Sequence, residues 1–552
     1  MKISAFFAAV LVFLNFYYSA FGNLIKNTST AEITFDFSET GGVIPNVADN
    51  LNFWDMGTTF YEPTVNEDNN VFDFVKYVQL MQCTGGTADR DLFEDPLDTS
   101  TYTDYKFDRL LENCRGIIEL GAKPHLKLGG VPLKFTSGYE MGGFDMNVYP
   151  PDDYNVYYNY IKAIAQALVD EFGIDEVKTW RFGCMTEYEN SDWFMAKSGD
   201  PADSAVAYCK LYDYTVQALV DVIGDEVFVG AHSMTVTEGL WDEEIFIRHV
   251  AEGTNYANGE KGTRICFLTA SFYDSNPGKF TSGKTLPETI TYLKETAEKY
   301  GLENLIYGID EGRILSGNTS GKDDSQLLSR QTGFTWQAAY DARLFSQAIL
   351  SGADYFSSWS LLSDGGFNGY PTMSYHIASN LAKFEGMKIV SADTQQLKTG
   401  LKVEIGNLCA VDEETGTIRA MVYNFKNKVN YKGKADVTLN IPAEDGKIYR
   451  ITQYVVGDDC NYFDEWQEDR KTYGITDDCF GWSPEDSAVE NTIVLNDAKA
   501  REIYFSQLRD KYIECSKLIP TETEVTAEGG MITLNILLEA SNVVFYEIEE
   551  VK

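Results

Sequence analysis

The chain has 552 residues, of which 44% are hydrophobic, and this predicts a globular protein made of one large domain and a smaller one. Its formal net charge is −39 at pH 7, and a surface with that excess of carboxylates repels nucleic acid and anionic membranes. We therefore expect neither a nucleic acid nor a membrane as a partner of this protein.

The first 22 residues, MKISAFFAAVLVFLNFYYSAFG, follow the order of a secretory signal peptide. Lys2 precedes a short apolar stretch, and the small residues Ala20 and Gly22 come just before a predicted cleavage site at Asn23. No later stretch reaches the roughly 20 apolar residues that a membrane-spanning helix needs. We predict that residues 1–22 are removed and that the protein is secreted to an extracellular location.

Residues 49–388 alternate between short apolar runs and amphipathic stretches, after an N-terminal strand and lead-in at residues 23–48. One amphipathic stretch begins with TLPE at 285–288, which has the form of a helical capping box. Eight strand–helix repeats predict an α/β protein with a (β/α)8 TIM barrel, whose active site lies at the carboxyl ends of the strands. The eight apolar runs are NFWDMGTTF, KYVQLMQCTGG, KPHLKLGGVP, TWRFGCMTE, VFVGAHSM, ICFLTASFY, NLIYGIDE and ADYFSSWSLL.

After residue 388 the hydrophobic pattern changes to a period of two. Segments such as TIRAMVYNF, ADVTLNIP and YRITQYVV are separated by Gly, Asp and Asn turns. They predict an accessory C-terminal antiparallel β-sandwich over residues 389–552, with one helix near SQLRDKYIECSKL. The segment AEITFDF at 31–37 has the same alternation, and we expect it to pair with this sandwich.

The cysteines and histidines do not form a metal-binding pattern. The four His residues are scattered and no CxxC occurs, so we expect no metal and no cofactor. Cys460 and Cys479 each follow Asp-Asp in a polar loop and are the pair that suits a disulfide, which the sequence leaves open. Asn27 and Asn318 fit the N-glycosylation pattern. Cysteines in apolar contexts are predicted to be buried free thiols, namely Cys114, Cys184, Cys209 and Cys266.

Two carboxylates lie where apolar runs end. Glu187 ends the fourth run, inside TWRFGCMTEYENSDWF, and Glu311 ends the seventh. Two carboxyl groups facing each other across a barrel mouth are what glycoside hydrolysis requires, one as proton donor and one as nucleophile or base. Spacing alone is a weak signal, because the chain has 84 Asp and Glu residues and any barrel has acids at its rim.

Several stretches resemble glycoside hydrolase family 39. YIKAIAQALVDEFGIDEVKTWRFGCMTEYEN is similar to the region that leads to the family's acid/base, where W-x-F-x-x-W-N-E-P-N follows a YG-x-x-EV turn. AKPHLKLGGVP and ADYFSSWSLLSD resemble its third and eighth strands, and YRITQYVVGDDCNYFDEWQ resembles part of its accessory β-domain. The matching positions are Pro132, Trp180, Phe182, Glu187, Trp359 and Asp364.

This resemblance implies a barrel plus β-sandwich and a retaining reaction on glycosides, in a family that contains β-xylosidases and α-L-iduronidases. It implies Glu187 as the general acid/base and Glu311 as the nucleophile. The chain also departs from the family. Thr186 replaces an Asn that contacts the sugar's 2-hydroxyl, and the other departures are Gln79-Leu80-Met81 for Arg-x-His, Tyr188 for Pro, Ser271-Phe272 for His-Tyr and Asp310 for Thr. Contacts to the sugar at the cleavage site are therefore predicted to differ, which favours a sugar other than unmodified xylose.

Aromatic residues near the strand ends are candidates for substrate binding. Trp54 and Trp359 either form the floor of the sugar site by stacking or pack in the barrel core. Tyr273 either donates a hydrogen bond to the nucleophile or is a satisfied buried hydroxyl. With Thr186, these residues form the predicted substrate-binding set.

Other charged residues near the site have simpler interpretations. Glu189 is interpreted as a loop acid, with a role as the proton donor as the alternative. We expect Asp310 to point away from Glu311, because successive residues of a strand face opposite sides. Lys127 and Lys134 are expected to be structural.

The function predicted from the sequence is a secreted retaining glycoside hydrolase that cleaves oligosaccharides or polysaccharides by a two-carboxylate double displacement, in an exo-acting mode. Two alternatives stay open. One is a carbohydrate-binding protein on the same fold that has lost catalysis, and the other is an endo-acting glycanase. The sugar, the linkage and the oligomeric state are not determined by the sequence.

Overall fold

The structure is a computed structural model, and it describes residues 28–53, 71–81, 83–234, 239–276, 279–280, 284–314, 335–359, 372–398, 403–428, 431–474 and 498–551. The predicted signal peptide lies outside these ranges, as do Trp54, the acceptors Asn27 and Asn318, and Cys479. The predictions made for those residues stay predictions.

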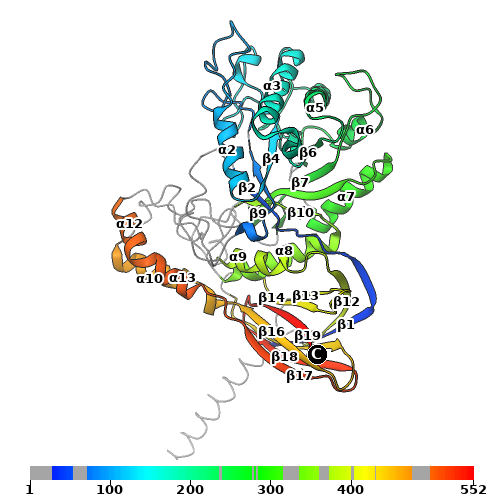
Figure 1. The fold of residues 1–552 in the computed structure, drawn as a ribbon, viewed down its shortest axis with the longest axis vertical. Helices are drawn as coiled ribbons and strands as arrows, with labels where there is room; N and C mark the ends of the chain where they lie inside the picture. Colours follow the sequence, from blue (N-terminus) through cyan, green and yellow to red (C-terminus); the bar gives the residue numbers. More distant parts are fainter. Residues whose placement is uncertain are drawn as a thin grey trace, which may run out of the picture.

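The larger domain is a closed parallel barrel of eight strands, as predicted (Figure 1). The eighth strand is interrupted at Ser357, and its two halves close the sheet because one pairs with the seventh strand and the other with the first. The strands are β2 (Asn50–Phe53), β3 (Tyr77–Leu80), β4 (Lys123–Leu128), β5 (Arg181–Cys184), β6 (Phe228–Met234), β7 (Phe267–Asn276), β9 (Ile306–Ile314), β10 (Tyr355–Phe356) and β11 (Ser358–Trp359). A two-residue strand, β8 (Lys279–Phe280), pairs antiparallel with β7 beside the barrel.

Helices between the strands form the outer layer of the barrel (Figure 1). Their starts follow local sequence signals: Thr285 and Glu288 form the predicted capping box, and Asp200 caps a helix that has Pro201 in its first turn. The helices are α2 (Asp108–Glu119), α3 (Tyr154–Phe172), α4 (Ile174–Val177), α5 (Pro201–Ile223), α6 (Glu244–Glu252), α7 (Leu286–Lys299), α8 (Trp336–Ser351) and α9 (Met373–Ala382), with 3-10 turns η1 (Val71–Asp73) and η2 (Leu133–Phe135).

The second domain is built on a sheet of nine strands in the order β17-β16-β19-β14-β13-β12-β1-β15-β18. As predicted, the strand before the barrel joins this sheet, but it runs antiparallel to β12 and parallel to β15, so the sheet is mixed rather than wholly antiparallel. A strand contributed from before the barrel can enter a sheet in either direction, because no hairpin fixes its direction. The strands are β1 (Thr28–Val43), β12 (Lys388–Lys398), β13 (Glu404–Val411), β14 (Ile418–Phe425), β15 (Lys434–Pro442), β16 (Ile448–Val456), β17 (Thr521–Thr526), β18 (Met531–Leu538) and β19 (Val543–Glu550).

A helical arm extends from this domain (Figure 1). The sequence predicted one helix near residues 506–518, and the structure has a continuous helical run there that begins earlier, together with a separate helix before it. The arm comprises η4 (Asp458–Cys460), α10 (Phe463–Tyr473), α12 (Ala498–Ile503), the π-helical turn η6 (Tyr504–Leu508) and α13 (Arg509–Cys515).

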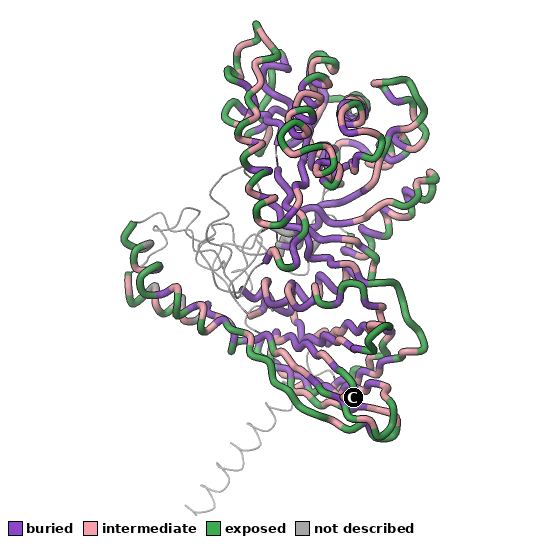
Figure 2. Tube along the Cα trace, in the orientation of Figure 1, coloured by how far each residue is buried: buried purple, intermediate pink, exposed green. Residues whose placement is uncertain are grey.

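Helix α8 lies between the barrel and the second sheet (Figure 1) and is buried along most of its length (Figure 2). Its buried residues lie on all sides of the helix and include the polar Gln337 and Asp341, so the helix is covered on all sides. The Trp336 indole donates to the carbonyl of Lys426 at 3.1 Å, and Arg343 pairs with Glu404 at 2.7 Å. The larger hydrophobic core accordingly continues from the barrel into one face of the second sheet.

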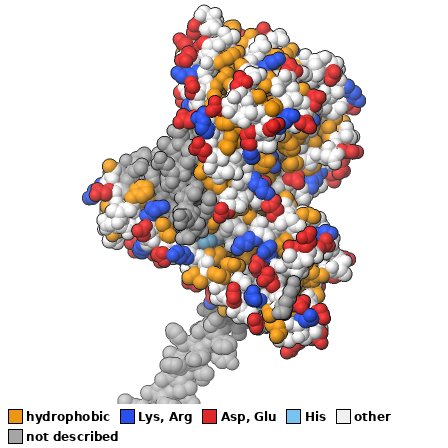
Figure 3. All heavy atoms as spheres, in the orientation of Figure 1, with side chains coloured by type: hydrophobic (Ala, Val, Ile, Leu, Met, Phe, Trp, Pro, Cys, Tyr) orange, Lys and Arg blue, Asp and Glu red, His pale blue; other side chains and the backbone are white. Residues whose placement is uncertain are grey.

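Other residues on which the sequence analysis made predictions are one structural lysine and four buried thiols. Lys134 is fully buried, pairs with Asp104 at 2.8 Å and lies over the Phe93 ring, as expected of a structural lysine. Of the predicted buried thiols, Cys114, Cys184 and Cys209 are buried, whereas Cys266 is only half-buried. The visible surface carries interspersed cations and carboxylates (Figure 3).

Within the described ranges, no helix combines the length and apolarity needed to cross a membrane. Among the same residues, no group of three or more His, Cys, Asp or Glu side chains is placed to hold a metal ion.

Candidate active site

Glu187 lies in a sharply turned loop directly after β5. Met185 and Glu187 both have positive φ, 62° and 41° respectively. The Met185 N–H donates to the carbonyl of Leu128 at 2.6 Å, and a Cβ at Gly129 would lie 2.6 Å from the Met185 nitrogen. The loop after β5 therefore packs directly on the end of β4. Positive φ at non-glycine residues is costly and is concentrated at functional sites.

The Glu187 carboxyl group is almost fully withdrawn from water. The residue is 7% exposed, and its Oε2 accepts from the Trp193 indole and from the Asn190 amide, both at 3.1 Å. Burial, together with the nearby charge of Glu311, raises the pKa of Glu187 to about 8. A carboxyl group in this environment keeps its proton near neutral pH.

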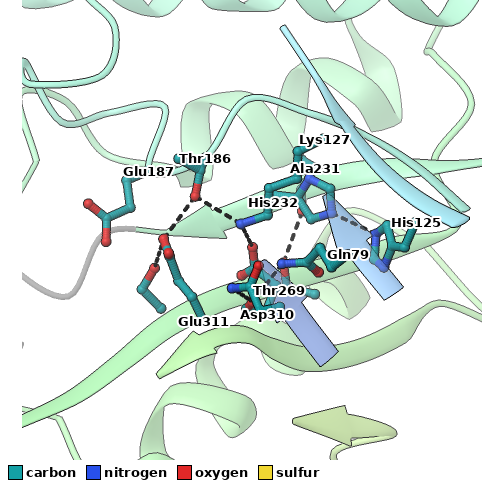
Figure 4. A network of polar contacts seen from close by, with 12 residues as sticks. Gln79, His125, Lys127, Thr186, Glu187, Ala231, His232, Thr269, Asp310 and Glu311 are labelled. Carbon is teal, nitrogen blue, oxygen red and sulfur yellow. Dashed lines mark hydrogen bonds and ion pairs between the residues drawn. The ribbon is translucent and has the colours of Figure 1, made fainter. Parts of the chain in front are cut away.

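Glu311 lies opposite Ser271 in the pairing of β7 with β9. It is 3% exposed, and its Oε1 accepts from two hydroxyl groups, Ser271 Oγ at 2.9 Å and Thr186 Oγ1 at 2.8 Å. Two donors on one oxygen suit a carboxylate acceptor. Since Thr186 comes from the loop after β5, this contact also joins the two strand ends that carry the glutamates (Figure 4).

The side chain of Asp310 points into the site, whereas the sequence analysis expected it to point away from Glu311. The register of β7 and β9 shifts between Ala270 and Ser271, so that Asp310 is the extra residue of a β-bulge. Its side chain pairs with Lys127 at 2.7 Å, and Lys127 in turn donates to Thr186 Oγ1 at 3.2 Å (Figure 4). Strict alternation fails because a bulge adds one residue to one strand, so Asp310 and Glu311 belong to one polar network.

The carbonyl of the bulge residue is held from across the barrel. Gln79 on β3 and Asn52 on β2 donate their side-chain amides to the Asp310 carbonyl at 2.7 and 3.1 Å. These bonds replace the ladder pairing that a bulge residue loses. Gln79 stands where the family pattern has Arg, and here its side chain holds the backbone of the bulge.

Two histidines lie near this network (Figure 4). His125 and His232 are fully buried with their Nε2 atoms 2.7 Å apart, and burial lowers the pKa of both well below the ordinary value. His232 fits because residue 183 is glycine: a Cβ there would lie 1.8 Å from its ring. The pair is therefore neutral and adds no charge to the site.

The Trp193 ring that donates to Glu187 is itself covered. Phe144 stacks on it with ring centroids 4.3 Å apart and an interplanar angle of 14°. Phe144 lies in the long loop after β4 and is partly exposed. Two loops, one after β4 and one after β5, thus support the Glu187 side chain.

The structure brings Glu187, Glu311 and Thr186 together. Tyr273 is buried on β7 opposite Arg313, two residues beyond Ser271. Glu189 is fully buried rather than a solvated loop acid, and it packs against Gly239. Trp54 and the side chain of Trp359 lie outside the part of the chain that the structure describes.

Sequence reasoning missed four residues of this site. Ser271 appeared only as a lost histidine, Gln79 only as a lost arginine, Trp193 lay uninterpreted six residues after Glu187, and Lys127 was interpreted as structural. A signal for Lys127 did exist, since His125 and Lys127 alternate along β4 and both contact groups inside the barrel.

Chemically, the arrangement can hold one proton and one negative charge at adjacent positions. Glu187 can donate a proton to an oxygen, and Glu311 can attack carbon or stabilise a cation. The donor set around them contains hydroxyl, amide and indole groups, which orient carboxyl groups.

Comparison with known proteins identifies the family of the chain. Residues 89–404, more than half of the chain, match the sequence model of the Glycosyl hydrolases family 39. A β-xylosidase of Geobacillus stearothermophilus is 30% identical over 151 residues, which cover 26% of this chain and 27% of that protein. A β-xylosidase of Caldicellulosiruptor saccharolyticus is 28% identical over 181 residues, covering 32% and 36% respectively. The alignments thus span about a third or less of the curated relatives.

A similar fold is seen in a solved structure, that of a monomeric β-xylosidase from Caulobacter crescentus CB15. It superposes with a TM-score of 0.63 and 16% identity, covering 94% of this chain and all of that one. At this identity the likeness shows a shared fold. It extends over both domains.

Proposed function

We propose that this chain, which belongs to the Glycosyl hydrolases family 39, is a retaining glycoside hydrolase in which Glu311 and Glu187 carry the two steps of the reaction. The resemblance inferred from the sequence is thereby confirmed at the level of the family. The roles of individual residues, the substrate and the site of action are our proposals.

In the first step Glu311 attacks the anomeric carbon, and the bond from that carbon to the leaving oxygen breaks as Glu187 gives its proton to that oxygen. The product is a glycosyl ester on Glu311. In the second step Glu187, now a carboxylate, takes a proton from water as the water oxygen attacks the same carbon. The ester bond breaks and Glu311 leaves as a carboxylate, so the configuration is retained.

The observation that carries this assignment is the contrast between two adjacent glutamates. Burial keeps Glu187 protonated, with a pKa raised to about 8, whereas Glu311 accepts two hydroxyl hydrogen bonds. Pairs of titratable groups in contrasting environments are how enzymes separate the acid from the nucleophile.

Labelling with a 2-fluoro glycoside tests the assignment directly. Such a reagent traps the glycosyl ester, and peptide mapping identifies the labelled residue. We expect the label on Glu311. A label on Glu187, Glu189 or Asp310 would make the assignment wrong.

We also propose an exo-acting enzyme for a sugar other than unmodified xylose. The curated relatives are named β-xylosidases, but Thr186 replaces the family's Asn, and its hydroxyl hydrogen goes to Glu311 rather than to a sugar. Aryl xylosides should therefore be poor substrates within a panel of aryl glycosides. A kcat/KM of about 10⁴ M⁻¹s⁻¹ or more on xyloside would contradict this, and shortening of a polysaccharide from within its chain would favour endo action.

Secretion is a separate proposal that rests on the order of residues 1–22. Mass spectrometry of the protein recovered from the medium should show Asn23 as the first residue. A soluble product that keeps Met1 would contradict it.

A further inference from the structure

Lys127 lies inside the barrel on β4, next to the network that holds the proposed nucleophile (Figure 4). It is 2% exposed and has two polar contacts in the site, Asp310 Oδ2 at 2.7 Å and Thr186 Oγ1 at 3.2 Å. A buried lysine is costly unless its charge is matched and its hydrogens are used. Asp310 matches the charge and two of the three ammonium hydrogens have acceptors, and both partners lie beside glutamates of the proposed mechanism.

Counting hydrogens fixes the direction of these bonds. An ammonium group can only donate, so Thr186 Oγ1 must accept from Lys127. The hydroxyl of Thr186 has one hydrogen, and the oxygen 2.8 Å away on Glu311 is an acceptor. Lys127 therefore leaves Thr186 with its hydrogen directed at Glu311.

We propose that Lys127 is a positioning residue that acts through Thr186 to hold the Glu311 carboxylate in its attacking orientation, with Asp310 as the counter-ion of the lysine. This inference rests on the proposed function of Glu311. It assigns a role to Asp310, where the chain departs from the family pattern, and to Lys127, which the sequence analysis interpreted as structural.

The surrounding groups make Lys127 the source of positive charge in this network. From β5 comes Glu187, which burial keeps protonated; from β9 come Asp310 and Glu311. His125 on β4 and His232 on β6 are neutral, since burial lowers the pKa of both. The ammonium charge is thus balanced by Asp310, and its effect passes to Glu311 through the Thr186 hydroxyl.

The site keeps Asp310 in place independently of the lysine. The bulge carbonyl of Asp310 is held by Gln79 and Asn52, so replacing Lys127 removes the charge without releasing the backbone of β9. This makes substitution at Lys127 a usable test.

The test is the acid limb of the pH profile of kcat/KM, which reports the ionisation of the nucleophile, Glu311, in the free enzyme. Lys127→Met should move this limb to higher pH by about one unit and should lower kcat. Thr186→Val should move it by a similar amount. In the Thr186→Val background, Lys127→Met should add little, because the hydroxyl that passes on its effect is gone.

Two further variants control for loss of structure. Lys134→Met removes another buried lysine, paired with Asp104 away from the site; it should lower the midpoint of thermal unfolding without moving the acid limb. Should Lys127→Met fail to fold because the Asp310 carboxylate has lost its counter-ion, Lys127→Met with Asp310→Asn removes both charges together, and it should still move the limb upward.

The outcomes are distinct. If Lys127→Met leaves the acid limb in place, or moves it equally with and without the Thr186 hydroxyl, positioning through Thr186 is wrong. If the 2-fluoro label is not on Glu311, the proposed function fails first. A label on Glu311 with an unmoved limb overturns this inference alone.

Discussion

Trp193 donates its indole N–H to Oε2 of Glu187 across 3.1 Å, from six residues further along the same loop. The ring is nearly fully buried, and Phe144 from the loop after β4 stacks on it. An N–H donor to a carboxylate oxygen favours the charged form of Glu187, whereas burial and the nearby charge of Glu311 favour the protonated form. The acid is therefore set by two opposing effects, and each can be altered separately.

Trp193→Phe keeps the stacking ring and removes the donor. Activity should be lost as the pH rises through the pKa of Glu187, about 8, because the acid then lacks its proton. Without the indole donor the protonated form is favoured further, so the basic limb of kcat/KM should move upward by about one unit. A downward shift would show that the indole stabilises the acid form.

The matched control is Trp180→Phe. The Trp180 indole donates to Glu176 at 3.0 Å on the outside of the barrel. This variant loses the same kind of bond and should be less stable, with its basic limb unchanged.

Glu187→Ala and Glu311→Ala should differ in how they respond to azide. Without Glu187, substrates with good leaving groups still form the glycosyl ester, and azide should restore turnover by attacking it with net retention. Without Glu311 no ester forms, so hydrolysis should be lost for all glycosides. If azide takes the place of the missing carboxylate, the glycosyl azide that forms should have inverted configuration. Azide rescue of Glu189→Ala with a retained product would instead assign the proton donor to Glu189.

Thr186→Asn should change how the enzyme reads the second carbon of the sugar. The Thr186 hydrogen is engaged with Glu311, whereas an Asn amide offers two donors. The ratio of kcat/KM for a glycoside to that for its 2-deoxy analogue should rise about tenfold, the value of one hydrogen bond. Thr186→Ser keeps the hydroxyl and should leave the ratio as it is. An unchanged ratio in the Asn variant would place the 2-hydroxyl out of reach of this position.

Asp91→Asn should destabilise the loops at the barrel mouth. The two Asp91 oxygens accept from Gly86 N at 2.6 Å and Leu133 N at 2.8 Å and so join the loops after β3 and β4. An amide has one acceptor oxygen, which leaves one buried N–H facing another donor, at a cost of about 1–3 kcal/mol. The free energy of unfolding in urea measures this. Asp89→Asn, on the exposed side of the same loop, should change it by less than about 0.5 kcal/mol.

The pH dependence of this difference has a defined sign. Burial raises the pKa of Asp91 to about 7 in the folded protein, so the folded state binds a proton that the unfolded state releases near pH 4. Wild-type stability from this group is therefore present at low pH and is lost as the pH rises toward 7. The difference in the free energy of unfolding between wild type and Asp91→Asn should become smaller as the pH rises from about 4 to 7. A difference that grows would contradict the raised pKa.

Much of the architecture follows from the sequence alone. Eight apolar runs alternating with amphipathic stretches predict the barrel, because each period is local and each strand end faces the same mouth. The same rule places Glu187 and Glu311 at that mouth. The direction of β1 in the second sheet could not be predicted from the sequence. Its partner β15 lies some 400 residues away, and nothing local selects a parallel or an antiparallel pairing.

The polar network of the site was decided by the tertiary structure. Lys127, Thr186 and Glu311 come from three strands or strand ends, and their order of donation depends on distances set by barrel closure. The bulge at Asp310 reverses the side that alternation predicts, and it depends on cross-barrel amides from Asn52 and Gln79. Alternation along a strand predicts which side of the sheet a residue faces only where the strand register is unbroken. The register itself is a property of pairs of strands, so residue types and spacing determine the two carboxylates, and only the folded barrel determines what holds them.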